Sequence, residues 1–354
     1  MPNLPALDIS KRVNHSPHVV ILGAGASRAT APHGDAAGRR LPVMDDLVEI
    51  VGLGDILAEA SIPTCGRNFE EIYSELCEGD AHDLLKDYLE KMVRDYFAGL
   101  ELPVGLTSYD ILLLSLREKD VIATFNWDPF LLQAYRRNAR VRKLPQLLFL
   151  HGCVSLGVCN ECRIQDCVGR KCGKCGRPLT PTRLLYPVKE KDYTADPFIS
   201  SQWAALREAV NRAYFLTIFG YSAPISDAAA IELLHSMWRD NGARTLAEVE
   251  IIDIQSKEVV YPKWERFITR SHYLVRDDIR RSYLAWHPRR SCEALAFATL
   301  QNDPWADDWL PDLDKVDALQ EWLEPLLQEE DALKRDGSPL SGQPCTNTPR
   351  RLTT

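Results

Sequence analysis

The stretch HVVILGAGAS at residues 18–27 decides the fold class, because it joins a short apolar run directly to a turn of small residues. Four more apolar runs follow along the chain: VIATFNWD (121–128), LLFLHG (147–152), AYFLTIFGYS (213–222) and VEIIDI (249–254). Each run is nearly continuous and does not alternate with polar residues, which is typical of strands covered on both faces of a parallel sheet. The sequence therefore predicts an α/β fold built on a parallel sheet.

Four of the five runs end in small or polar residues. These ends are residues 23–27, Asn126 with Asp128, His151 with Gly152, and residues 220–222. Open α/β sheets bind their ligands in the crevice at the carboxyl ends of the strands. An ordinary loop can follow any one apolar run, but four such ends together predict a ligand site.

The composition limits the classes of protein to which the chain can belong. It has 354 residues, enough for one large domain or two ordinary ones, and 45% of them are hydrophobic. The net charge of −8 argues against a general nucleic-acid binder, so we expect no direct nucleic-acid binding. No apolar run approaches the ~20 residues that span a bilayer, and the first residues do not resemble a signal peptide. We therefore expect a cytoplasmic protein that does not enter a membrane.

Outside the apolar runs the sequence predicts helices and two irregular ends. The main domain is expected at 18–333, with a helical insertion at 30–117 and later helices at 201–213, 225–240 and 314–333. Residues 334–354 are rich in Pro, Gly, Ser and Thr, which is typical of a disordered tail. Residues 1–17 are assigned to an N-terminal extension.

Six of the ten cysteines lie within residues 153–175, a clustering that indicates metal binding rather than a disulfide framework. Two CxxC pairs, separated by nine residues, supply four thiolates for one tetrahedral zinc ion: Cys159, Cys162, Cys172 and Cys175. Nothing suggests an open coordination position, so we expect a structural zinc in a small module at 153–182. Cys153 and Cys167 are surplus, and Cys167 as a substitute ligand is the less favoured alternative.

Each candidate site residue also has a simpler structural interpretation. Residues 23–27 either approach a phosphate or only make a tight strand-to-helix turn. Asn126 and Asp128 either face the crevice or cap the next helix through an Asx turn. A lone histidine is more often structural than catalytic, but the position of His151 at a strand end favours a site role. Asp253 either accepts hydrogen bonds from a ribose or faces solvent.

In their order along the chain, GAGAS, TFNWD, LHG, CxxC…CxxC, the GYS turn and a late acidic strand resemble the sirtuin (Sir2) family. The resemblance covers roughly residues 18–260. It implies a Rossmann-like NAD-binding sheet with a helical insertion and a small inserted zinc-ribbon-like module. It also implies NAD⁺ as a substrate, in chemistry that begins by breaking the bond between nicotinamide and ribose.

The resemblance assigns roles to two groups of residues. Asn126 and Asp128 match the Asn and Asp of the family's TQNID motif near the nicotinamide ribose, and His151 matches its catalytic histidine. Asn126 is expected to position water or ribose hydroxyls, His151 to act as general base or orienter, and Asp128 to give electrostatic support. The residues expected to bind the cofactor are Gly23, Ala24, Gly25, Ser27, Gly220, Ser222 and Asp253, the last standing where the family has an Asn.

Three departures from the family pattern bear on the activity. Phe125 replaces the motif's Gln, and GRRLPVMDDL (38–47) stands where the deacylase branch has GIPxFR. After the zinc module, RLLYPVKEKDYTADP (183–197) does not match the peptide-binding segment of deacylases that ends in FGE. This segment and GYSAPISDAAA (220–230) are instead more similar to the divergent Sir2-like NADase branch of bacterial antiphage defence proteins.

The resemblance therefore implies an NAD⁺ glycohydrolase that acts in antiphage defence by NAD⁺ depletion. A regulatory protein partner or a homo-oligomer is expected to hold such an activity in check. The complete zinc module is shared with deacylases, so an NAD⁺-dependent protein deacetylase or deacylase is the alternative. A non-catalytic NAD- or nucleotide-binding sensor is the further alternative, which the presence of both Asn126 and His151 disfavours.

Overall fold

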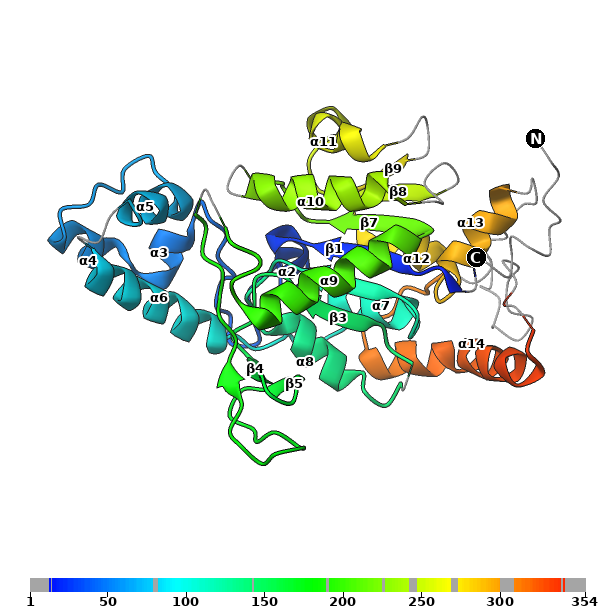
Figure 1. Cartoon of the computed structure of the whole chain (residues 1–354). Coiled ribbons are helices and arrows are strands. Elements are labelled where there is room, and N and C mark those ends of the chain that lie inside the picture. The colour runs from blue at the N-terminus through cyan, green and yellow to red at the C-terminus, as the bar shows by residue number, and fades with distance from the viewer. Residues whose placement is uncertain are drawn as a thin grey trace.

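A six-stranded parallel sheet forms the centre of the molecule (Figure 1). The computed structural model describes residues 13, 15–78, 82–141, 143–188, 191–224, 227–241, 247–268, 273–299, 309–338 and 340. In spatial order the strands are β3 (Gln146–Phe149), β2 (Val121–Thr124), β1 (His18–Leu22), β7 (Phe215–Phe219), β8 (Glu248–Ile252) and β9 (Tyr273–Arg276). All neighbouring strands pair in parallel, so their carboxyl ends share one edge. The predicted Rossmann-like α/β fold class is confirmed.

The burial of the strands follows from their position in the sheet. Every residue of β1 and β7 is buried, as expected for central strands with both faces covered. The sequence analysis missed β9, whose residues are all half-buried because it lies at the edge of the sheet. An edge strand of four residues has no continuous buried pattern to reveal it.

Two groups of helices pack around the sheet. Helix α9 (Pro197–Arg212) packs on β2 and β3 beside α10 (Ala228–Arg239), in front of the sheet in Figure 1. Helix α9 begins four residues earlier than predicted, because the Asp196 side chain accepts the N–H of Ile199 as a cap. The second group contains α2 (Ala24–Thr30), α7 (Ser108–Ser115), α8 (Phe130–Arg137) and α14 (Val316–Asp336), with α7 in contact with the other three.

Four helices of the predicted insertion lie to one side of the sheet (Figure 1). They are α3 (Leu47–Val51), α4 (Gly54–Glu59), α5 (Phe69–Leu76) and α6 (Asp83–Ala98). Helix α5 begins with a capping box in which Asn68 and Glu71 exchange side-chain and backbone hydrogen bonds. Helix α7, although within 30–117, packs against α2 and α8 and is therefore part of the main body.

Helix α11 (Lys257–Trp264) connects β8 to β9. After β9 the described chain continues through the short helices α12 (Tyr283–Trp286) and α13 (Ser291–Thr299) to α14. Helix α14 continues three residues past the predicted start of the tail at 334 and ends at Gly337, whose φ of 66° allows the left-handed cap. The remainder of the predicted tail, 339 and 341–354, lies outside the described residues, as do residues 1–12 and 14 of the predicted extension. Within the described ranges, no helix combines the length and apolar character needed to cross a membrane.

The cysteine-rich segment forms a second, three-stranded sheet. Its antiparallel order is β5 (Ile164–Cys167), β4 (Leu156–Cys159) and β6 (Thr180–Pro181). The chain enters it directly after β3, at the carboxyl edge of the main sheet. Gly152, at φ 79°, lies so close to the returning chain that a Cβ there would be 2.0 Å from the Arg183 carbonyl oxygen.

Candidate active site

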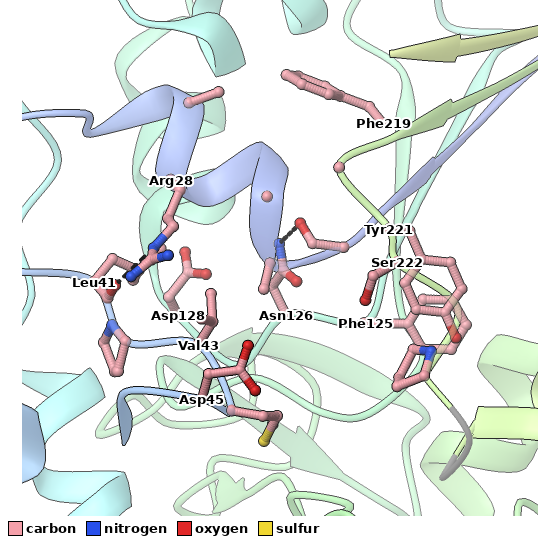
Figure 2. A pocket seen from close by; sticks show the side chains of 18 of the residues that line it. Arg28, Leu41, Val43, Asp45, Phe125, Asn126, Asp128, Phe219, Tyr221 and Ser222 are labelled. Atoms are coloured by element: carbon pink, nitrogen blue, oxygen red, sulfur yellow. Dashed lines mark hydrogen bonds between the residues drawn. The ribbon is translucent and has the colours of Figure 1, made fainter. Parts of the chain in front are cut away.

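A cavity of about 1080 Å³ opens at the carboxyl ends of the central strands. The turns after β1, β2, β3, β7 and β8 all contribute to its walls. Figure 2 shows Asn126 and Asp128 after β2 beside Tyr221 and Ser222 after β7. Nine of the ten residues predicted for the site line it: Gly23, Ala24, Gly25, Asn126, Asp128, His151, Gly220, Ser222 and Asp253. The tenth, Ser27, lies directly behind this wall. The polar strand ends thus meet in one place, as parallel strands require.

Asn126 is held at the cavity wall by a network of hydrogen bonds. Its Nδ2 donates to the Gly23 carbonyl oxygen at 2.8 Å, to Ser27 Oγ at 2.9 Å and to Tyr109 Oη at 3.1 Å. Its backbone N–H donates to Thr124 Oγ1 at 3.0 Å. Within the described residues, Oδ1 accepts no hydrogen bond, which leaves this oxygen as an acceptor for a ligand in the cavity.

Asp128 is the buried end of the same network. Ser27 Oγ donates to Asp128 Oδ2 at 2.6 Å, Tyr109 Oη lies 2.7 Å from Ser27 Oγ, and the Phe130 N–H donates to Oδ1 at 3.0 Å. Burial raises the pKa of Asp128 to about 6, although the hydrogen bonds from Ser27 and Phe130 oppose this. At neutral pH Asp128 is therefore mostly ionised. The Phe130 contact also shows that the Asx-turn interpretation holds together with a position at the cavity.

His151 is buried, and it packs among aromatic rings. Phe125 meets its ring edge-on at 4.8 Å between centroids, and Tyr193 lies 6.0 Å away in a stacked orientation. Burial lowers the pKa of His151 to about 3, so that the ring is neutral at pH 7. Its Nε2 is buried and makes no hydrogen bond with the described residues.

Three residues beside His151 were not predicted from the sequence. Asp227 Oδ1 forms a buried ion pair with Lys191 Nζ, and Asp227 Oδ2 accepts a hydrogen bond from Tyr221 Oη at 2.8 Å. Burial by itself raises the pKa of Asp227, but its charged and hydrogen-bonded neighbours lower it below the usual range. Asp227 and Lys191 belong to no sequence motif, and only their contact reveals them. The Tyr221 ring also stacks on Phe125, with centroids 4.4 Å apart (Figure 2).

Glycines are required at 23 and 25 because the turn after β1 lies very close to the turn after β7. A Cβ on Gly23 would lie 2.5 Å from Tyr221 Cα, and one on Gly25 would lie 2.8 Å from Gly220 Cα. The Gly25 N–H donates to the Gly220 carbonyl oxygen at 2.8 Å, so it is not free for a phosphate. The tight-turn interpretation of residues 23–27 therefore accounts for part of this motif, although Ala24 still faces the cavity.

Two arginines add positive charge to the cavity wall. Arg28, on α2, forms an ion pair with Asp46 and donates to the Leu41 carbonyl oxygen at 3.4 Å (Figure 2). Arg40 lies 3.5 Å from Asp46 and 3.7 Å from Glu49, and its side chain is 62% exposed. Both arginines line the cavity, so segment 38–47 contributes to the site although its sequence departs from the deacylase pattern.

Ser222 and Asp253 lie on the turns after β7 and β8. The Asp253 N–H donates to the Arg276 carbonyl oxygen, and its Oδ1 accepts the Gln255 N–H at 2.8 Å. This Asx turn leaves Oδ2 of Asp253 without a hydrogen bond from the described residues. Ser222 precedes Ala223, whose φ of 52° is left-handed. Both residues line the cavity, and their role in binding a cofactor stays a prediction.

The four predicted zinc ligands form one group. The Sγ atoms of Cys159, Cys162, Cys172 and Cys175 all lie within 4.8 Å of one another. A tetrahedral zinc with bonds of about 2.3 Å separates its sulfur ligands by about 3.8 Å, so the group fits such an ion. Backbone N–H groups of Cys175 and Lys174 lower the pKa of Cys172, which favours the thiolate that a metal requires. Cys153 and Cys167 lie outside this group of four.

No protein-family model and no curated protein matches this chain. Solved structures that it resembles include a Sir2 homologue in complex with NAD, at 14% identity and a TM-score of 0.36, over 83% of this chain and 93% of that chain. A structure described as Sir2 bound to acetylated peptide matches at 15% identity and a TM-score of 0.35, over 78% of this chain and 93% of that one. At such low similarity the function has to be argued from the site itself.

Proposed function

We propose that this protein is a Sir2-like NAD⁺ glycohydrolase that cleaves NAD⁺ to nicotinamide and ADP-ribose. The observation that carries the proposal is the meeting of Asn126, Asp128 and His151 in one cavity, on the strand ends that the sequence resemblance implies. The cavity of about 1080 Å³ is slightly larger than the ~300–1000 Å³ range of small-molecule pockets, and so has room for a dinucleotide.

The charges of the site suit the two ends of this substrate. Arg28 and Arg40 line the cavity, and although both lie beside Asp46, we infer that their positive charge attracts the diphosphate. Nicotinamide leaves as a neutral molecule and positive charge then develops on the ribose, which the carboxylate of Asp128 stabilises. Oδ1 of Asn126 accepts a hydrogen bond from a ribose hydroxyl or from the attacking water. Water adds to the ribose carbon that nicotinamide leaves, and its proton passes to the neutral ring of His151.

Side chains of the chain itself support hydrolysis over deacylation. Lys191 and Tyr193 belong to segment 183–197, and both are buried beside His151. We infer that their side chains leave little room for an acylated lysine next to this histidine. Water, which needs little room, is therefore the nucleophile that we propose.

The test is nicotinamide release from NAD⁺ by the purified protein, with and without an acetylated peptide. Release without peptide is expected, and release only with peptide would instead establish a deacylase. Because each residue acts on the reacting centre, Asn126→Ala and His151→Ala should each lower the rate about 100-fold or more. His15→Ala is the matched control, since His15 is exposed and precedes the amino end of β1. Full activity in both site variants would refute the assignment.

We also propose that NAD⁺ depletion serves antiphage defence, with a protein partner or a homo-oligomer restraining the enzyme. This step rests on the sequence resemblance. The helical insertion is the proposed place for such control, because Pro42, Met44 and Asn68 from it line the cavity. Cells carrying the wild-type protein should lose NAD⁺ on infection, and cells carrying Asn126→Ala should not. Equal NAD⁺ levels in both would contradict a defence role.

A further inference from the structure

Asp227, Lys191 and His151 form a buried cluster in which two cationic or potentially cationic groups face one carboxylate oxygen. Lys191 Nζ pairs with Asp227 Oδ1, and His151 Nε2 lies 3.9 Å from the same oxygen. The side chains are 4%, 6% and 6% exposed for Lys191, Asp227 and His151, so water does not screen their charges. The other oxygen, Oδ2, is taken by Tyr221.

The distance of 3.9 Å is too long for a hydrogen bond, yet His151 Nε2 has no other partner among the described residues. A buried ring nitrogen without a hydrogen-bond partner destabilises this arrangement of His151. The carboxylate that would satisfy it is engaged by Lys191, whose charge also opposes a second positive charge nearby. A closer approach of roughly 1 Å would give the ordinary bond length of ~2.9 Å. The ion pair with Lys191 therefore occupies the Asp227 oxygen that could otherwise accept a hydrogen bond from His151 Nε2.

We propose that Asp227 is the positioning residue of His151 and that Lys191 withholds it, so that Lys191 and His151 compete for Asp227 Oδ1. When Asp227 accepts the Nε2–H of His151, this ring nitrogen is fixed as the donor and Nδ1 becomes the proton acceptor. The carboxylate also stabilises the imidazolium that forms when the ring takes a proton from water. The catalytic consequence rests on the proposed NAD⁺ hydrolysis, whereas the competition itself does not.

The competition between Lys191 and His151 for Asp227 controls the proton affinity of His151. Burial lowers the pKa of His151 to about 3, Asp227 raises it, and Lys191 lowers it further. Among the described residues, the phenols of Tyr193 and Tyr221 also face the cluster, and burial raises their pKa values, so they stay neutral. The carboxylate of Glu70, which lines the same cavity, raises the pKa of Tyr221 in the same direction. Removal of Lys191 leaves the negative charge of Asp227 uncompensated. Protonation of His151 would then compensate this charge.

The experiment follows His151 by NMR titration of its ring nitrogens in wild type, Lys191→Met, Lys191→Arg and Asp227→Asn. In Lys191→Met the pKa of His151 should rise from about 3 toward the ordinary value of about 6.5, with the proton on Nε2. Lys191→Arg keeps the charge and should keep the wild-type titration. Adding Asp227→Asn to Lys191→Met should abolish the rise. Lys334→Met is the control, because the Lys334–Glu118 pair is exposed, at 70% and 56%.

Nicotinamide release against pH gives the catalytic readout. A base must be unprotonated, so activity is lost as pH falls through its pKa. In Lys191→Met this acidic limb should therefore move to higher pH, and the rate at pH 7 should rise several-fold because the base is stronger. An unchanged His151 titration in Lys191→Met would overturn the proposal. A shifted titration in a protein that releases no nicotinamide would support the competition and refute only the proposed hydrolysis.

Discussion

Gly220 lies where the turn after β7 crosses the turn after β1. Its φ is 60°, and a Cβ there would lie 2.2 Å from the Ala26 nitrogen and 2.4 Å from the Gly25 carbonyl carbon. Both neighbours are backbone atoms, so no side chain can swing away to make room. Gly220→Ala should lower the free energy of unfolding by about 3 kcal/mol or more, measured by urea denaturation.

Gly337 is the matched control for this substitution. Its φ of 66° is almost the same, but no atom lies within 4 Å of a Cβ there. Gly337→Ala should therefore cost only about 1 kcal/mol, the price of the left-handed backbone alone. Equal losses in the two variants would contradict the explanation by close approach.

Glu250 on β8 carries a carboxyl group in a position that disfavours its charge. Burial raises the pKa of Glu250 to about 7, although the Tyr283 N–H donates to Oε1 at 2.8 Å. A raised carboxyl pKa gives stability that is present below the unfolded pKa of about 4.5 and lost as pH rises through 7. Glu250→Gln should thus raise the unfolding free energy at pH 8 by about 3 kcal/mol.

The control for Glu250→Gln is to measure the unfolding free energy of the variant and the wild type at pH 4 as well as at pH 8. At pH 4 the carboxyl is protonated in both the folded and the unfolded chain, so the variant and the wild type should then be equally stable. A gain of equal size at both pH values would point to packing rather than to ionisation.

At the scale of elements, the cysteine module has too small an apolar core to hold its sheet. Its own buried cluster is formed by Cys159, Cys172 and Leu179, whereas Leu156 and Val158 of β4 pack into the main core. We therefore expect metal binding to supply much of the stability at the cysteine end of the module. Cys175→Ser should lose the zinc that we expect at one ion per chain, measured by metal analysis. Residues 156–181 should then become open to limited proteolysis, while the main sheet stays folded.

Cys167 provides a matched substitution in the same module. It ends β5 but lies outside the group of four sulfurs. Cys167→Ser should therefore retain zinc and resist proteolysis as the wild type does. Loss of zinc from this variant would instead make Cys167 a ligand.

At the scale of the whole molecule, Arg289 joins the C-terminal helix α14 to the body. This buried guanidinium pairs with Glu330 of α14 and donates to the carbonyl oxygen of Leu116 at 2.8 Å. Glu330→Ala leaves the charge buried and unpaired, so the unfolding free energy should fall by about 3–5 kcal/mol in urea denaturation. The exposed pair between Lys334 and Glu118 links the same parts, and Lys334→Ala should cost less than about 1 kcal/mol. A similar loss of unfolding free energy in Glu330→Ala and Lys334→Ala would show that burial does not determine how much an ion pair contributes to stability here.

The sequence predicted those features whose cause is local. Continuous apolar runs identified five of the six strands, because central strands must be apolar on both faces. Strand β9 was missed because, at the edge of the sheet, its residues are only partly buried. Two CxxC pairs identified the metal group, since each tight turn directs two sulfurs to one point. Asn126, Asp128 and His151 were found because parallel strands bring their ends to one edge.

The sequence by itself therefore determined the sheet, the edge at which the candidate site lies and the group of four cysteines that could hold a metal ion. The tertiary structure alone decided that Tyr109 joins the Asn126 network and that Lys191 pairs with Asp227, 36 residues away along the chain. The physical reason is that apolar patterns and turns act on neighbouring residues, whereas an ion pair depends on the distance between distant segments. Packing sets that distance and removes the water, and so gives the Lys191–Asp227 pair its influence on His151.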